Sequence, residues 1–138
     1  MALRKNAKVE MLKRVPLFSR CSNKELGEIA QITDEIDLPE GRVLTKEGAS
    51  GREFFVLIEG NADVRRKRRK VGTLGPGDFL GEIALVTKTP RTATVKTTSP
   101  VRALVVSEQN FRRLLQQTPQ VQIKVLEALA ERVAATSL

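Results

Sequence analysis

The spacing of apolar residues changes twice along the chain and divides it into three stretches. Residues 1–37 show the three-to-four spacing of amphipathic helices. Pro16 interrupts this pattern, and beyond it Ser22 and Glu25, in the run SNKE, have the spacing of a capping box at the start of a helix. We therefore predict a helical stretch up to about Asp37, broken at Pro16.

Residues 38–107 differ because short apolar runs alternate with glycine and proline. Eight of the nine glycines fall between Gly41 and Gly81. Many short strands with such punctuation are typical of a sandwich or a barrel-like roll. No helix of useful length separates these runs, which argues against a parallel sheet built from strand–helix–strand units. We predict a mainly β fold, an antiparallel, jelly-roll-like β-roll of about eight strands with flanking helices.

Residues 108–138 return to helical spacing. Phe111, Leu114 and Leu115 predict a short amphipathic helix. Thr118 and Pro119 predict the start of a second one, as the N-cap and the first helical residue. Such a helix packs its apolar stripe on the rest of the chain or pairs it with a second chain. We predict one domain over residues 1–138, in which the stripe of the last helix consists of Val121, Val125, Leu129 and Val133.

The amino-acid composition excludes several kinds of site. The chain has no His, Trp or Tyr and a single cysteine, Cys21. Zinc sites, disulfides and histidine acid–base catalysis are therefore excluded, and base stacking on aromatic side chains is not a major binding mode. With no nucleophile–base pair and no metal cluster, we predict no enzymatic activity and no cofactor. The lone thiol and the lack of a long apolar run predict a cytoplasmic protein.

The charge is strongly positive and partly concentrated in one place. Lys and Arg outnumber Asp and Glu by 24 to 16, a net charge of +8, which favours an anionic partner. Six consecutive cations occupy residues 65–70, between the apolar runs NADV and VGTL. Such a run can bind nucleic acid or an anionic membrane. We favour a solvated hairpin tip, because consecutive strand residues point to opposite faces and split the charge between them.

The richest chemistry lies in the stretch 72–95, GTLGPGDFLGEIALVTKTPRTATV. Gly81 has no Cβ, so a ligand can approach the backbone there, and the first-turn N–H groups that follow it suit an anion. Arg91, behind the rigid Pro90, can hold a phosphate at two points. An ionised Glu82 suits a sugar hydroxyl. Singly, Glu82 and Arg91 also fit a helix start and a surface cation; together, they favour a site for phosphate and ribose.

This stretch resembles the phosphate-binding cassette of the cyclic-nucleotide-binding domains, found in protein kinase A regulatory subunits, cGMP-dependent kinase, cyclic-nucleotide-gated channels and catabolite activator protein. The family pattern is F-G-E-[ILV]-A-L, a short loop, and P-R-[TA]-A-T-V. This chain has FLGEIAL, VTKT and PRTATV, with Leu80 as one extra residue. The segments VPLF, PEGRVLTKEG and FFVLIEGNADV resemble the family's first helical segment and early strands. The two last helices resemble its hinge and lid.

The resemblance implies a role for each residue of the cassette. Glu82 is expected to accept a hydrogen bond from the ribose 2′-OH, and Arg91 to pair with the cyclic phosphate. The backbone N–H groups of Gly81, Ala84 and Thr92 are expected to donate to phosphate or ribose oxygens.

The resemblance extends to the surroundings of the ligand. Ile83 and Leu85 are expected to line the pocket or pack under it. Apart from the resemblance, Arg132 is a candidate to lie over the purine, since guanidinium planes stack on rings, or else it is a solvated cation. The helix that begins at Pro119 is expected to cover the base and relay binding. The hydroxyl of Thr92 permits cGMP, while cAMP is favoured.

Three readings of the function follow. The first is a sensor whose partners are a cyclic nucleotide, an effector protein or domain, and a second copy of the chain through the C-terminal helix. The second is a degenerate roll that serves as an interaction scaffold, against which the retained Glu82 and Arg91 argue. The third is a nucleic-acid or anionic-membrane binder that uses residues 65–70. The first accounts for the whole cassette and is preferred.

Overall fold

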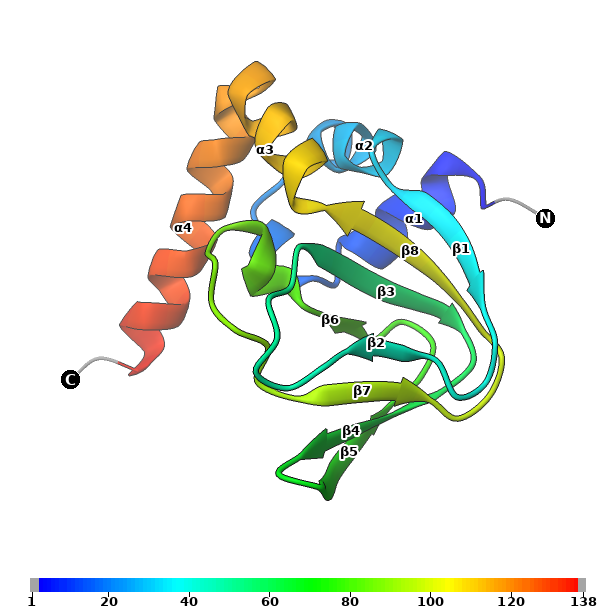
Figure 1. Ribbon diagram of the computed structural model, residues 1–138. Helices are drawn as coiled ribbons and strands as arrows, with labels where there is room; N and C mark the ends of the chain where they lie inside the picture. Colours follow the sequence, from blue (N-terminus) through cyan, green and yellow to red (C-terminus); the bar gives the residue numbers. More distant parts are fainter. Residues whose placement is uncertain (1–2, 137–138) are drawn as a thin grey trace. The chain divides into compact units, whose positions relative to one another are not determined.

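The computed structural model of the chain describes residues 3–136, which form two units (Figure 1). One unit contains the residues up to Ile32 and from Gln109 onward, and it is helical. The other unit, Thr33–Glu108, is mainly β. The predicted fold class, a β-roll with flanking helices, is confirmed. That the two units act as one domain stays a prediction.

The β unit consists of two antiparallel sheets of four strands each (Figure 1). The first contains, in spatial order, β1 (Asp34–Leu38), β8 (Val101–Ser107), β3 (Glu53–Glu59) and β6 (Phe79–Leu80). The second contains β2 (Val43–Thr45), β7 (Thr94–Thr97), β4 (Ala62–Arg66) and β5 (Arg69–Leu74). The strand number agrees with the prediction, and every named pair is antiparallel.

Aliphatic side chains from both sheets form the core of the β unit. Leu57, Val101 and Ala103 come from the first sheet, and Ala62 and Val95 from the second. These five residues are buried in one cluster, as expected for strands whose alternate side chains face a common interior. The core fixes the register of β7, the strand that follows the cassette, and of β3, the strand that pairs with β6 just before the cassette.

The first strand begins earlier than the sequence predicts. The helical stretch was expected to reach Asp37, but its last helix ends at Gln31 and β1 starts at Asp34. The run DEIDL pairs with β8 over its whole length, and its two aliphatic side chains, Ile36 and Leu38, pack against the core. Asp34 shares the face of Ile36 and Leu38, so apolar and polar side chains alternate over only three residues of this strand, which is too short a pattern to indicate a strand.

The helical unit contains α1 (Lys5–Leu12), a 3₁₀ turn η1 (Pro16–Phe18), α2 (Asn23–Gln31), α3 (Glu108–Gln117) and α4 (Pro119–Thr136). The predicted capping box is present at α2. The N–H of Ser22 donates to Glu25 Oε1 at 2.8 Å, and the N–H of Glu25 donates to Ser22 Oγ at 3.2 Å. The hydrogen bond from the Ser22 backbone lowers the pKa of the Glu25 carboxyl. Among residues 3–136, no helix is both long and apolar enough to cross a membrane.

The apolar stripe predicted on the last helix is only partly buried. Val121 and Val125 are buried, whereas Val133 is 65% exposed. A spacing of four residues advances by about 40° per step on a helix of 3.6 residues per turn, so the last member of the stripe has rotated away from the first. Ala128 is buried and continues the packed face of the helix, where the sequence analysis had placed Leu129 and Val133.

Candidate functional site

The glycine-rich turn before the cassette is fastened to β3. The N–H of Gly77 donates to the carbonyl oxygen of Leu57 and the N–H of Leu57 donates to that of Asp78, both at 2.8 Å. The side chain of Asp78 closes the turn by accepting from the N–H of Gly75 at 2.8 Å. This turn is followed by β6 and then by a short 3₁₀ helix, η2 (Glu82–Leu85). The start of the cassette is therefore held by the backbone of a central strand.

Gly81 occupies a position that no other residue fits. Its φ of +82° lies in the left-handed region that favours glycine. A Cβ at this position would lie 2.8 Å from the carbonyl oxygen of Glu53 and would overlap the guanidinium of Arg91. Because Gly81 has no side chain, the Arg91 guanidinium can lie close to its backbone. Arg91 is thereby brought near the residue that directly precedes Glu82.

Arg91 is positioned by the loop between β2 and β3. The N–H of Gly48 donates to the carbonyl oxygen of Arg91 and the N–H of Arg91 donates to that of Ala49, both at 2.8 Å. The guanidinium itself donates from Nη2 to the carbonyl oxygen of Glu53. Burial lowers the pKa of Arg91, and the nearby Glu53 carboxylate opposes this shift. The group stays ionised at neutral pH, because arginine is not deprotonated in proteins.

The other predicted residues differ in burial and in availability. Glu82 is buried, with 6% of its surface exposed, and Ala84 and Leu85 are buried beside it. The N–H of Ala84 donates to the carbonyl oxygen of Gly81 at 3.1 Å, so donation to a ligand requires this N–H to be shared. Thr92 is exposed. The side chains of Ile83 and Arg132 lie outside those that the structure describes.

Sequence reasoning missed two contributors, Gly51 in the loop that precedes β3 and Glu53 at the start of β3. Gly51 lies against the Arg91 side chain so closely that a Cβ would overlap its Nε and Cζ atoms. Glu53 supplies the carbonyl oxygen that accepts from the guanidinium. The available signal was the pair of glycines in KEGASGREF, which was interpreted only as turn punctuation.

The basic run does form the hairpin tip that the sequence predicts, between β4 and β5 (Figure 1). Its residues are exposed. The tip is not simply surrounded by solvent, however, because it borders an open groove shared with the Arg91 loop. The groove is lined by Glu47, Gly48, Arg66, Lys67, Arg91 and Thr92.

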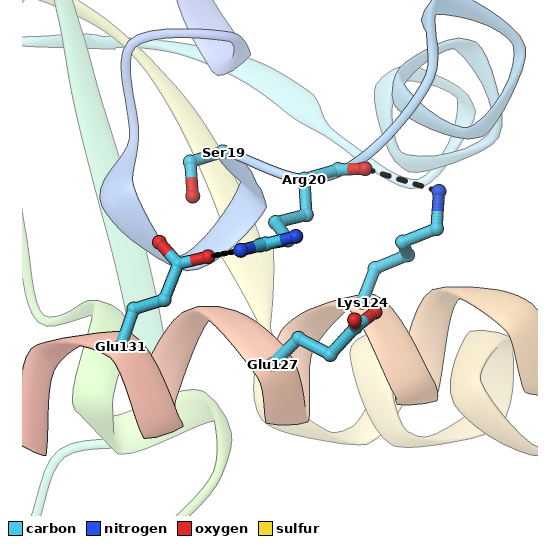
Figure 2. Close-up of a pocket in the computed structure, with 5 residues that line it drawn as sticks. All are labelled: Ser19, Arg20, Lys124, Glu127 and Glu131. Atoms are coloured by element: carbon cyan, nitrogen blue, oxygen red, sulfur yellow. Dashed lines mark hydrogen bonds and ion pairs between the residues drawn. The ribbon is translucent and has the colours of Figure 1, made fainter. Parts of the chain in front are cut away.

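A second open pocket lies in the helical unit, between η1 and α4. Figure 2 shows Arg20 paired with Glu131, and Lys124 directed at the carbonyl oxygen of Arg20. The Lys124 Nζ atom is 3.1 Å from that oxygen and 3.3 Å from Glu25 Oε1. The charges of this pocket therefore serve to hold α4 in place. Within the described residues, no group of three or more His, Cys, Asp or Glu is arranged to hold a metal ion.

Cys21 is half-buried near the same helices. Burial raises the pKa of its thiol to about 11, and the Glu25 carboxylate adds to the shift. The thiol stays protonated at neutral pH, and a thiol reacts as its thiolate.

Comparison with known proteins identifies relatives over most of the chain. The family model of the cyclic nucleotide-binding domain matches residues 35–118. The cAMP-dependent protein kinase regulatory subunit of Mycosarcoma maydis is 38% identical over 77% of this chain. The match covers 22% of that relative, so the chain spans about a fifth of its length. The relative is a regulatory subunit and not a catalytic one.

Solved structures show the same fold. The N-terminal domain of a transcriptional regulator from Streptomyces coelicolor A3(2) superposes with a TM-score of 0.84 at 28% identity, over 92% of this chain and 94% of that one. The cAMP-bound PfPKA-R superposes with a TM-score of 0.68 at 27% identity, over 91% of this chain and 47% of that one.

Proposed function

Because the chain belongs to the cyclic nucleotide-binding domain family, we propose that it senses cAMP, with cGMP bound more weakly, through Gly81–Leu85 and Arg91–Thr92. The family's domain is a regulatory one. The observation that carries the proposal is the contact between the Arg91 guanidinium and the backbone of Gly81, the residue before Glu82. Glu82 and Arg91 are nine positions apart in sequence, and the approach of Arg91 to residue 81 brings the cation to the backbone next to the carboxylate-bearing residue.

Arg91 and Glu82 bind different parts of the ligand, the phosphate and the ribose. The guanidinium has five N–H donors in a fixed fork, and Nη2 already donates to the Glu53 carbonyl oxygen. The cyclic phosphate is bound by the remaining donors, which are held in place before the ligand arrives. Glu82 accepts from the ribose 2′-OH. Its burial keeps water away from that hydrogen bond, which strengthens it.

The preference for cAMP rests on the similarity to a cAMP-dependent regulatory subunit, whereas Thr92 bears on whether cGMP also binds. Thr92 is exposed beside Arg91, so its hydroxyl is available to the 2-amino group of a guanine. One neutral hydrogen bond of this kind adds only about 0.5–1.5 kcal/mol. It therefore permits cGMP without making it the preferred ligand.

Glu82→Gln tests the ribose contact, because an amide oxygen still accepts a hydrogen bond but carries no charge. In the unaltered chain, 2′-deoxy-cAMP is expected to bind about tenfold to 150-fold more weakly than cAMP, the loss of one hydrogen bond to a charged group. In Glu82→Gln the same comparison is expected to give about two- to tenfold. Calorimetric titration measures all four affinities.

Glu59→Gln is the matched control, since it removes the same charge from an exposed residue at the C-terminal end of β3, outside the cassette. It is expected to behave as the unaltered chain does. An equal penalty for the deoxy ligand with Glu82 and with Gln at residue 82 would place the 2′-OH elsewhere.

The last helix is proposed to relay binding. Ion pairs from Arg20 and Lys124 fasten α4 inside the helical unit, and a helix responds to a ligand only if its contacts differ between the two states. We expect cAMP to slow amide hydrogen exchange from Gln120 to Val133 as well as in the cassette. Exchange measured by mass spectrometry, with and without cAMP, checks this. Slowing confined to Gly81–Thr92 would mean that the signal leaves by another route.

The effector and a second copy of the chain stay predictions. α4 exposes Ile123 and Leu126, which are 56% and 63% exposed. They are three residues apart, as the apolar positions of a coiled-coil heptad are. A second copy of the chain is proposed to pair at this face, and not at the face that carries Val121 and Val125.

A further inference from the structure

Four of the six cations of the basic hairpin fall into two groups with different surroundings. Arg65 and Lys70 face each other in the strand register, and both contact Asp63, at 3.9 Å and 3.3 Å. That face of the hairpin therefore carries its own counter-charge. Arg66 points to the opposite face, because consecutive strand residues alternate. Arg66 and Lys67 line the groove beside the Arg91 loop.

The hairpin tip is tied to that loop. Lys67 and Arg68 have φ values of +49° and +69°, the left-handed geometry of a two-residue hairpin turn. The N–H of Lys67 donates to Glu47 Oε1 at 2.9 Å. The N–H of Glu47 in turn donates to Thr94 Oγ1 at 3.0 Å. These two hydrogen bonds connect the tip to the β2–β3 loop and, through that loop, to β7.

The anchored tip and the Arg91 loop border a groove of about 700 Å³, a size typical of small-molecule sites. Arg66, Lys67 and Arg91 bring three positive charges to it, and Glu47 brings one negative charge. The Glu47 carboxylate accepts a hydrogen bond from the Lys67 backbone N–H, which fixes the position of the carboxylate. The groove therefore attracts anions, and its cations come from two separate segments of the chain.

We propose that this groove is a second anion site, which binds a chain of phosphates, either free or carried by a nucleoside triphosphate. Three cations from two segments suit a ligand with several negative charges, which a chain of phosphates supplies along its length. A cyclic nucleotide has one phosphate, which the proposed function assigns to the Arg91 guanidinium. The groove includes Arg91, so the two sites overlap at that residue, and Arg66 and Lys67 are the cations that only the groove site uses.

Nucleic acid fits the groove less well. On the Asp63 face one carboxylate offsets part of the charge of Arg65 and Lys70, so the net positive charge there is smaller than in the groove, where three cations accompany Glu47. All five Phe residues lie in the described part of the chain, and each is buried or partly buried. Stacking of single-stranded bases needs exposed aromatic rings. A compact phosphate chain needs only the cations.

The test is calorimetric titration of the whole chain with sodium tripolyphosphate. Saturable binding of one tripolyphosphate per chain is expected. The double variant Arg66→Ser with Lys67→Asn is expected to weaken it at least tenfold. Asn tolerates the left-handed backbone at residue 67, so the turn is preserved. The matched control, Arg65→Ser with Lys70→Ser, removes the same charge from the Asp63 face and is expected to stay within threefold. Thermal unfolding of each variant shows that the fold is retained.

Titrations with ATP, with inorganic phosphate and with a single-stranded oligonucleotide identify the source of the phosphates. Equal affinities for ATP and tripolyphosphate would support a site for the phosphate chain alone, and tighter binding of ATP would support a site that also contacts the nucleoside. Equal losses in the two double variants, or inorganic phosphate binding as tightly as tripolyphosphate, would overturn the proposal. So would tighter binding of a single-stranded oligonucleotide. A failure to bind cAMP would overturn the proposed function and leave these results standing.

Discussion

Replacing Arg91 with alanine is expected to weaken cAMP binding by about 30-fold to several thousand-fold. The change removes one partner of a partly buried charge pair, a loss of about 2–5 kcal/mol. Arg91→Lys is expected to bind cAMP more weakly than the unaltered chain but more tightly than Arg91→Ala, because an ammonium keeps the charge but not the planar fork. Calorimetric titration measures each affinity.

The exposed Arg42 provides the control, since Arg42→Ala makes the same substitution outside the cassette. It is expected to leave the affinity unchanged within twofold to threefold. An Arg91→Ala variant that also binds cAMP within threefold of the unaltered chain would remove Arg91 from the phosphate site.

Gly81→Ala is expected to damage both stability and binding. At a φ of +82° an alanine is strained, and the free energy of unfolding is expected to fall by about 1–3 kcal/mol. The new Cβ also occupies the space of the Arg91 guanidinium. The guanidinium must move, so we expect cAMP to bind at least tenfold more weakly. Thermal unfolding and calorimetric titration measure the two effects separately.

Gly72→Ala is the matched control in β5. A Cβ at residue 72 meets no atom within 4 Å. We expect a change in unfolding free energy within about 0.5 kcal/mol, as for ordinary surface substitutions, and no change in affinity. If Gly81→Ala retained full affinity, the close approach of Arg91 to residue 81 would have no part in binding.

The cassette was predictable from the sequence because its geometry is local. Gly81 and Glu82 are adjacent, and Pro90 fixes the backbone that presents Arg91, so their residue types alone indicate a phosphate and a ribose site. What holds Arg91 was not predictable. Its guanidinium donates to Glu53, which lies 38 residues away, and only the fold brings them together.

The same distinction applies to the fold. The capping box at Ser22 was found because it is a local pattern. The first strand was missed because the partners of Ile36 and Leu38 lie on β8 and in the core, far along the chain. The hairpin at residues 65–70 was expected, but its contact with Glu47 spans 20 residues and leaves no local sign in a run of like charges.

The central claim, that this chain binds cAMP at the Arg91 cassette, is tested most directly by titrating the unaltered chain with cAMP and with cGMP in a calorimeter. We predict saturable binding of one nucleotide per chain for both ligands, with the tighter binding for cAMP. No saturable heat from either nucleotide at millimolar concentration would contradict the account.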